Sequence, residues 1–218
     1  MRGGSTPPGA GSSTLELVFV LGIDPGVSRC GYGCVDRRVG GLSAVAAGVI
    51  TTDTAAPLPE RLADLAGELR SLIGELRPAA VAVERVFFQT NARTAMSVGQ
   101  ASGLALAAAA HAGCDVEQYT PNEVKQAVTG YGSANKDQVQ RMVAVLLGLP
   151  EPPAPSDAAD ALALAICHLT VAPRARRIEE SRQAVGRGRV AARDAGDARR
   201  EDAPSEDAPS EAARGGAP

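Results

Sequence analysis

One apolar strand limits the possible folds of this chain more than any other segment. Residues 15–24, LELVFVLGID, are apolar over most of their length and end in Asp24. Side chains of a strand alternate between two faces, so a strand that is apolar on both faces lies inside a sheet covered on both sides. Pro25 and Gly26 then end the strand. The segment predicts a central strand of an α/β domain, with a carboxylate at its carboxyl end.

The remaining hydrophobic pattern predicts a mixed sheet flanked by helices. Two further strands, over 30–37 and 42–52, follow short connections, which favour an antiparallel meander. Leucines at helical spacing predict a helix over 59–77, and a second buried strand, AAVAVERVFF, occupies 79–88. The order of elements indicates one α/β domain without internal repeats. The later elements are a helix over 94–113, a strand over 114–120, helices over 121–130 and 136–149, and a last helix from Ser156.

Composition divides the 218 residues into three parts. Residues 1–14 are rich in Gly, Ser, Pro and Thr, contain no apolar segment typical of a signal peptide, and are expected to be disordered. Residues 15–172 are long enough to form one hydrophobic core. Residues 173–218 have almost no large apolar side chains, and we expect a disordered tail that is Arg-rich over 173–193 and acidic beyond.

The net charge of −3 is unevenly distributed. Residues 15–172 carry nine Arg and two Lys against sixteen acids, a net of −5, whereas residues 173–193 carry seven Arg against two Glu, a net of +5. Two divalent cations held by core carboxylates leave a core charge of about −1. Charge therefore neither excludes nor favours a metal-dependent nuclease. No apolar run reaches the ~18 residues of a membrane span, and we expect a cytoplasmic protein that does not contact membranes.

Cysteines and histidines give no metal-binding pattern, because none of the four cysteines forms a C-x-x-C pair and the two histidines complete no zinc motif. We expect buried, reduced thiols, although the shared strand parity of Cys30 and Cys34 leaves a disulfide open. His168 lies about 12 Å along a helix from Asp160, so it is expected to be a core histidine. His111 is expected to cap the end of its helix. The cysteines are Cys30, Cys34, Cys114 and Cys167.

Two carboxylates open the otherwise apolar helix that follows Pro155. Asp157 and Asp160 are three residues apart, so their side chains lie about 60° apart on one face of the helix. Ser156 is the predicted N-cap. One interpretation is that both acids only offset the helix dipole. The other is that further carboxylates join them at the same place.

Two more carboxylates end the two buried strands. Asp24 and Glu84 are costly to bury unless they are paired, and ligands of α/β sheets bind outside the carboxyl ends of strands. Glu84 precedes Arg85, but adjacent strand residues face opposite ways. A salt bridge to Arg29 is the alternative explanation for Asp24. With the acids of the helix, the strand-end acids make a four-carboxylate site for Mg²⁺ or Mn²⁺ plausible, and two such ions about 3.5–4 Å apart hydrolyse phosphodiesters.

Five segments, in this order and spacing, resemble the RuvC family of Holliday-junction resolvases. They are VLGIDPG, VAVERVFF, GQASGLAL, VKQAVTGYGSANKDQVQ and SDAADALALAICH, and they span about residues 17–169. The resemblance implies a ribonuclease-H-like fold for 15–172 and a homodimer. It also implies two-metal cleavage of four-way DNA junctions in recombination and repair, leaving 5′-phosphate ends, and cooperation with the RuvA–RuvB branch-migration complex.

The resemblance also implies roles for single residues. The two lysines of the chain, among twenty arginines, are Lys125 and Lys136, and the resemblance makes both of them contacts to the DNA backbone, with Lys136 nearest the scissile phosphate. Arg85 is assigned to the same DNA-binding set. The family position for an aromatic that stacks on a junction base falls on Phe87, whereas strand parity favours Phe88, and a core role is open for either. The metal ligands implied are Asp24, Glu84, Asp157 and Asp160.

Three other functions fit parts of the pattern. An actin-like ATPase carries a similar strand-turn signature, but it needs a second lobe and a second phosphate loop. A related nuclease of ribosomal-RNA maturation lacks the lysine-bearing segment and its extra helix. A non-catalytic protein of the same fold does not require all four acids.

Overall fold

The computed structural model describes residues 19–85 and 92–172 of the chain. Five strands form one sheet in the order β3-β2-β1-β4-β5. β1 pairs antiparallel with β2, which pairs antiparallel with β3, whereas β1, β4 and β5 run parallel. This confirms the predicted meander and the central position of the first strand. The strands are β1 Phe19–Asp24, β2 Arg29–Arg38, β3 Gly41–Thr51, β4 Ala80–Glu84 and β5 Asp115–Tyr119.

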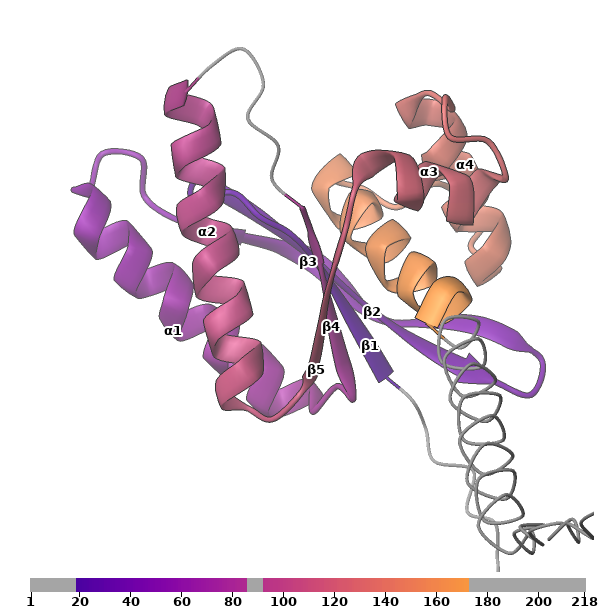
Figure 1. Ribbon diagram of the computed structural model, residues 1–218, viewed down its shortest axis with the longest axis horizontal. Coiled ribbons are helices and arrows are strands. Elements are labelled where there is room, and N and C mark those ends of the chain that lie inside the picture. The colour runs from indigo at the N-terminus through magenta and orange to yellow at the C-terminus, as the bar shows by residue number, and fades with distance from the viewer. Residues whose placement is uncertain (1–18, 86–91, 173–218) are drawn as a thin grey trace, which may run out of the picture. The chain divides into compact units, whose positions relative to one another are not determined.

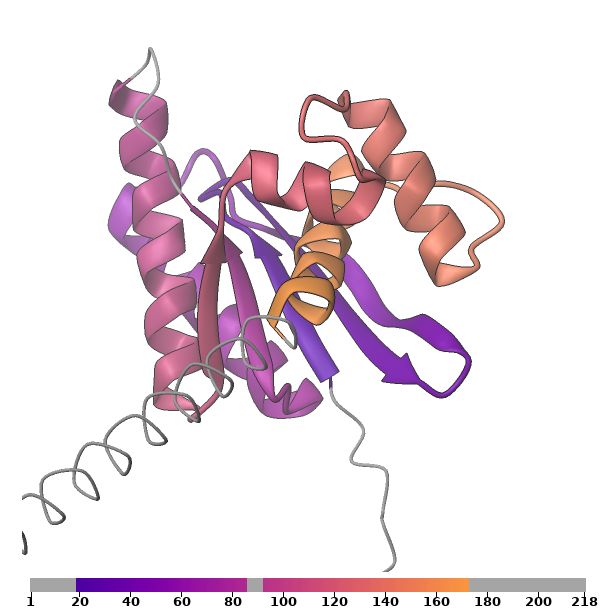
Figure 2. The same cartoon turned by 45° about the vertical axis from the view of Figure 1, so that its right-hand side comes forward.

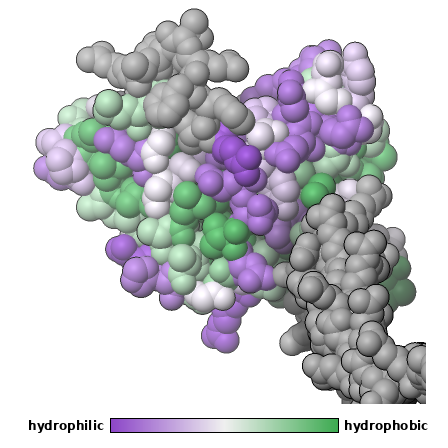
Figure 3. All heavy atoms as spheres, viewed as in Figure 1, coloured by the Kyte–Doolittle hydropathy of each residue, from purple (hydrophilic) through white to green (hydrophobic). Residues whose placement is uncertain are grey.

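Helices cover both faces of the sheet (Figures 1 and 2). α1 (Leu58–Leu76) and α2 (Ala92–His111) pack on one face, whereas α3 (Pro121–Thr129), α4 (Lys136–Leu147) and a last helix over 156–172 lie on the other. Each face has its own hydrophobic cluster. None of the helices within the described ranges combines the length and hydropathy that a membrane span requires. In the view of Figure 3, larger apolar areas lie over α1 and α2, and the surface over α3 and α4 is mainly hydrophilic.

Glycines bring the last helix directly against the sheet. A Cβ atom on Gly22 of β1 would lie 1.9 Å from the Ala161 carbonyl oxygen, and one on Gly31 of β2 would lie 2.2 Å from the Asp157 carbonyl oxygen. Gly33 has a similar contact with Leu162. Only residues without a side chain permit this approach. The helix that carries Asp157 and Asp160 is therefore held in direct contact with the backbones of β1 and β2.

Most predicted elements occur within a few residues of their expected bounds. The strand predicted over 79–88 ends at Glu84, and residues 86–91 lie outside the described part of the chain. The last helix begins at Ser156, and the carbonyl of Pro155 accepts a hydrogen bond from the Ala158 amide. The cap position therefore falls on Pro155, one residue earlier than predicted. All four cysteines are free, which removes the disulfide between Cys30 and Cys34.

Candidate active site

The parallel pairing of β1 with β4 brings two of the predicted acids together. Ile23 lies opposite Val83 in the register, and Asp24 and Glu84 are the next residues on their strands. Both carboxylates are therefore at the same edge of the sheet, where parallel strands present their carboxyl ends. The structure thus places the two strand-end acids side by side, as a shared site for them would require.

The first turn of the last helix contributes the other two acids. Close contact with Gly31 places Asp157 over β2, beside the end of β1. Asp160 lies one turn later and lines the same pocket as Asp24 and Glu84. The four acids lie close enough that Glu84, Asp160 and Asp157 all raise the pKa of Asp24. Four carboxylates from three separate segments are thus gathered in one region.

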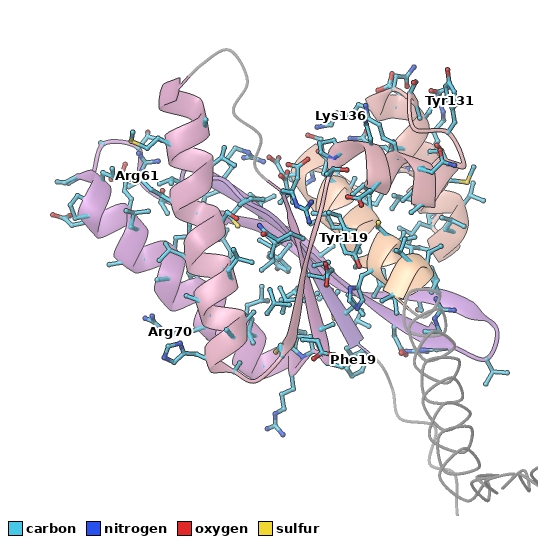
Figure 4. The ribbon with its side chains drawn as sticks, in the orientation of Figure 1. Phe19, Arg61, Arg70, Tyr119, Tyr131 and Lys136 are labelled. Atoms are coloured by element: carbon cyan, nitrogen blue, oxygen red, sulfur yellow. The ribbon has the colours of Figure 1, made fainter. Side chains whose placement is uncertain are left out.

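A pocket of about 210 Å³ is lined by Asp24, Glu84 and Asp160 and by residues of α3 and α4. Both lysines of the chain line it, Lys125 from α3 and Lys136 from the first turn of α4. Apolar side chains form the rest of its wall, including Val124 and Leu164. Figure 4 shows Lys136 on the α4 side of this region. The pocket therefore has carboxylates at the ends of β1 and β4 on one side and the two lysines of α3 and α4 on the other.

Capping boxes fix the helices that carry the lysines. The Thr120 hydroxyl accepts the Glu123 amide at 3.2 Å, and the Glu123 carboxylate accepts the Thr120 amide at 2.8 Å. Asn135 and Gln138 form the same reciprocal pair at the start of α4, with both distances 2.9 Å. Each box satisfies two amides that would otherwise have no partner. Lys136, the first residue of α4, is therefore projected from an ordered helix start.

Two cations pair with the acids of the last helix. The Nζ atom of Lys136 lies 2.6 Å from Oδ2 of Asp160, and a guanidinium nitrogen of Arg29 lies 2.9 Å from Oδ2 of Asp157. The alternative explanation for Asp24, a salt bridge to Arg29, is therefore wrong. Arg29 begins β2, and its side chain reaches across to the last helix instead. Asp157 lies over β2 within reach of Arg29, and the sequence alone does not show that the two residues are close.

Burial and mutual repulsion raise the pKa values of the two acids at the ends of β1 and β4. Burial, followed by the charges of the other three acids, raises the pKa of Asp24 to about 7. Burial and the charge of Asp160 also raise the pKa of Glu84. By contrast, the hydrogen bond from Arg29 lowers the pKa of Asp157. Negative charge at the strand ends is thus incompletely balanced by the protein's own cations.

This donor set fits a hard divalent cation. All four acids offer oxygen ligands, which Mg²⁺ and Mn²⁺ prefer, and a bound cation would relieve the repulsion that raises the pKa of Asp24. Among residues 19–85 and 92–172, no three acidic, histidine or cysteine side chains already converge into a closed metal site. Asp157 pairs with Arg29, and Asp160 pairs with Lys136, in each case through Oδ2. Either acid could bind a cation through its other carboxylate oxygen or by releasing its present partner.

The other predicted residues have clear positions or fall outside the described ranges. Arg85 is exposed just beyond β4 and donates to the Gln118 carbonyl at 3.1 Å. Phe87 and Phe88 lie in the undescribed segment 86–91. His168 is buried, and its Nδ1 lies 3.0 Å from the Tyr119 hydroxyl, which confirms a core role.

His111 also behaves as predicted. It is the last residue of α2, and its Nδ1 lies 3.3 Å from the Ala107 carbonyl. Such a contact satisfies a carbonyl at the end of the helix. The residue therefore belongs to the helix terminus and not to the site.

Comparison with known proteins shows the family of the chain. Residues 20–168 match the family model described as crossover junction endodeoxyribonuclease RuvC. The chain belongs to the RuvC family. The RuvC of Moorella thermoacetica is 50% identical over 163 residues, which cover 75% of this chain and 98% of the relative. The RuvC of Leifsonia xyli is 56% identical over 152 residues, covering 69% and 73%. Nucleases of the RuvC family generally depend on divalent metal ions.

Solved structures confirm the predicted fold class. The structure of Thermus thermophilus RuvC superposes with a TM-score of 0.68 at 38% identity, covering 72% of this chain and 97% of that one. The T. thermophilus RuvC complex with a Holliday junction substrate gives 0.67 at 40% identity, covering 71% and 94%. The five-stranded mixed sheet with helices on both faces is the ribonuclease-H-like sheet expected for RuvC.

Proposed function

We propose that this chain is a metal-dependent, structure-selective endonuclease that resolves Holliday junctions by paired nicks in opposing strands. The observation that carries the proposal is the pocket in which Asp24, Glu84 and Asp160 face Lys125 and Lys136. Carboxylates on one side can hold cations, and lysines on the other can hold a phosphate. The RuvC relative from T. thermophilus was solved with a Holliday junction substrate, which supports the same substrate here.

The four acids are proposed as ligands of two Mg²⁺ ions, for which Mn²⁺ substitutes. Asp24 lies near all three other acids, whose charges raise its pKa, and it would help to hold both ions. Two such ions, when bound, supply water activation and charge stabilisation at the leaving 3′ oxygen. Asp157 and Asp160 would hold the ions through carboxylate oxygens now beside Arg29 and Lys136. The assigned ligands are Asp24, Glu84, Asp157 and Asp160.

The two lysines are proposed to hold the scissile strand. Once Asp160 serves as a ligand, the ammonium group of Lys136 is available to a phosphate in the same pocket. Lys125 lies on the same wall and adds a second point charge. Arg85, exposed beside the end of β4, is proposed to contact the backbone further out. Phe87 remains the proposed aromatic that stacks on a junction base.

The oligomeric state, location and partners of the enzyme are part of the same proposal. A two-fold homodimer places one site on each of two opposing strands, since a two-fold axis repeats the site in the symmetry of the junction. Cleavage leaves 5′-phosphate and 3′-hydroxyl ends that a ligase can seal. We propose a cytoplasmic enzyme that works with a RuvA–RuvB branch-migration complex.

The direct test is incubation of the full chain with an end-labelled four-way junction. With Mg²⁺ we expect symmetric nicks in two opposing strands, and no cleavage when EDTA replaces the metal. Linear duplex of the same sequence and a structured RNA serve as substrate controls. Failure to cut the junction under any divalent metal, or equal cutting of the RNA, would overturn the proposal.

Variants of the acids test the metal assignment separately from substrate binding. We expect Asp24→Asn, Glu84→Gln and Asp160→Asn to abolish cleavage while junction binding in Ca²⁺ stays near that of the wild type. Ca²⁺ supports binding without turnover, because its coordination is larger and less regular. Asp64→Asn, on the exposed side of α1, is the matched control. Cleavage by Asp24→Asn at the wild-type rate would show that this acid is no metal ligand.

A further inference from the structure

A second hollow lies beside the connection between α3 and α4, outside the pocket of the acids. Its volume is about 310 Å³. Residues from both helices and from their connection line it, among them Tyr131, Gln138, Arg141, Met142 and Val145. The catalytic proposal uses none of these side chains. The hollow is therefore a separate candidate binding site.

Tyr131 is presented to solvent from an ordered backbone. Its side chain is exposed, with 62% of its surface accessible. Its amide donates to the Thr129 hydroxyl at 3.1 Å, and that hydroxyl lies 2.8 Å from the Lys125 carbonyl. Gln126 donates to the Gly130 carbonyl at 2.8 Å, and Gly130 has the positive φ of 75° that favours glycine. Because the backbone is already ordered, only the side chain of Tyr131 loses conformational freedom when it binds a ligand.

The other polar groups of the hollow suit one nucleotide. Arg141 offers a guanidinium, and within the described ranges no carboxylate forms a salt bridge with it. Gln138 offers an amide that both donates and accepts. Met142 and Val145 add apolar surface beside the ring. A base can stack on tyrosine and a phosphate can pair with arginine, which is the combination that single-stranded DNA sites use.

The position of the hollow connects it to the catalytic pocket. α3 contributes Lys125 to one pocket and Thr129, one helical turn later, to the other. Lys136 follows Tyr131 by five positions in the sequence, so their Cα atoms are at most about 18 Å apart. That distance corresponds to about five base-pair steps of 3.4 Å. A strand whose phosphate contacts Lys136 can therefore reach the hollow within a few nucleotides.

We propose that the hollow binds a nucleotide of the junction a few positions from the cleaved phosphate. Its base stacks on Tyr131, and an adjacent phosphate pairs with Arg141. This inference rests on the proposed function and adds a second DNA contact to it. The contact orients the cleaved strand, while the acids and Lys136 act on the scissile bond.

The test compares variants in binding a fluorescein-labelled four-way junction in Ca²⁺. We expect Tyr131→Ala and Tyr131→Leu to weaken binding at least about fivefold, whereas Tyr131→Phe keeps the stack and the wild-type affinity. Arg141→Gln should lower the slope of log affinity against log salt by about one, the loss of one phosphate contact. Arg70→Gln, on the opposite face of the sheet (Figure 4), should change neither quantity.

The outcomes separate this inference from the proposed function. If the wild type cuts junctions but Tyr131→Leu and Arg141→Gln, folded by their melting temperatures, bind junctions like the wild type, the hollow is not a DNA contact. If Tyr131→Phe is as weak as Tyr131→Ala, the hydroxyl and not the stack carries the interaction, and the assignment of a base is wrong. If the wild type itself neither binds nor cuts junctions, the proposed function fails first.

Discussion

The ammonium group of Lys136 lies 2.6 Å from a carboxylate oxygen of Asp160, although the two residues belong to different helices. This hydrogen bond raises the pKa of Lys136, and the charges of Asp24 and Asp157 add to the effect. The same ammonium group offsets part of the rise in the pKa of Asp24 and of Glu84. One lysine thus interacts with all the acids of the site, and its removal has consequences for both charge balance and substrate.

Lys136→Ala should slow junction cleavage by about 10²-fold at saturating Mg²⁺, because the proposed contact to the scissile phosphate is lost. Lys136→Arg keeps the charge and should retain part of the rate. Single-turnover cleavage of a labelled junction measures both. An Ala variant as fast as the wild type would remove Lys136 from the proposed substrate contacts.

The stability of the metal-free protein should fall as the pH rises from about 4 to 7. Asp24 has a pKa of about 7 in the folded protein against an ordinary value of 3.8. Within this window the folded state holds a proton that the unfolded chain has released, so the free energy of unfolding decreases with pH. The contribution of this group is at most about 1.4 kcal/mol per pH unit, and Glu84 acts in the same direction.

Urea denaturation in EDTA at several pH values measures this dependence. Asp24→Asn should be less sensitive to pH than the wild type and more stable than it at pH 7. Asp64→Asn, an exposed change on α1, should keep the wild-type curve. Parallel curves for Asp24→Asn and the wild type would mean that this carboxylate is not protonated near neutral pH.

Gly31→Ala should reduce both stability and cleavage. The added Cβ would lie 2.2 Å from the Asp157 carbonyl oxygen, so the last helix must move and take its acids with it. Overpacking of this kind costs about 1–3 kcal/mol of unfolding free energy. Gly74→Ala in α1, where a Cβ meets nothing within 4 Å, should instead stabilise by up to about 1 kcal/mol. Equal melting temperatures for the two variants would contradict the close contact.

Removal of residues 173–218 should leave junction cleavage at saturating DNA unchanged, because all the proposed metal ligands precede residue 173. The seven arginines of 173–193 should nevertheless contribute to non-specific binding. We expect the truncated chain to bind duplex DNA more weakly and with a shallower salt dependence, by about 0.9 in slope for each lost phosphate contact. Loss of folded protein on truncation would show that the tail forms part of the folded domain.

Much of the fold could be predicted because its signals are local. The short connections between the first three strands, leucine spacing in α1 and the apolar strands β1 and β4 each follow from short-range rules. A common site for Asp24 and Glu84 could also be inferred, since both acids end buried strands and ligands bind outside the carboxyl ends of strands. These signals do not depend on the exact distance between elements.

The charge pairs of the site could not be predicted in the same way. Arg29 is close to Asp24 in sequence, yet it pairs with Asp157, which is 128 residues away. The choice depends on how closely the last helix approaches β2, and glycine contacts set that distance. The hollow beside Tyr131 is likewise invisible in the sequence, because it depends on the packing of α3 against α4.

The two faces of the sheet should tolerate sequence drift very differently. On one face, long side chains such as Leu65, Leu69 and Ile73 separate α1 from the strands, and such layers accept exchanges of similar volume. On the other face, there is no room for a side chain at Gly22 or Gly31, where the last helix touches the strands. Neighbouring side chains cannot repack to accommodate a substitution at these glycines. A change that is tolerated beneath α1 would therefore, beneath the last helix, displace that helix together with its acids.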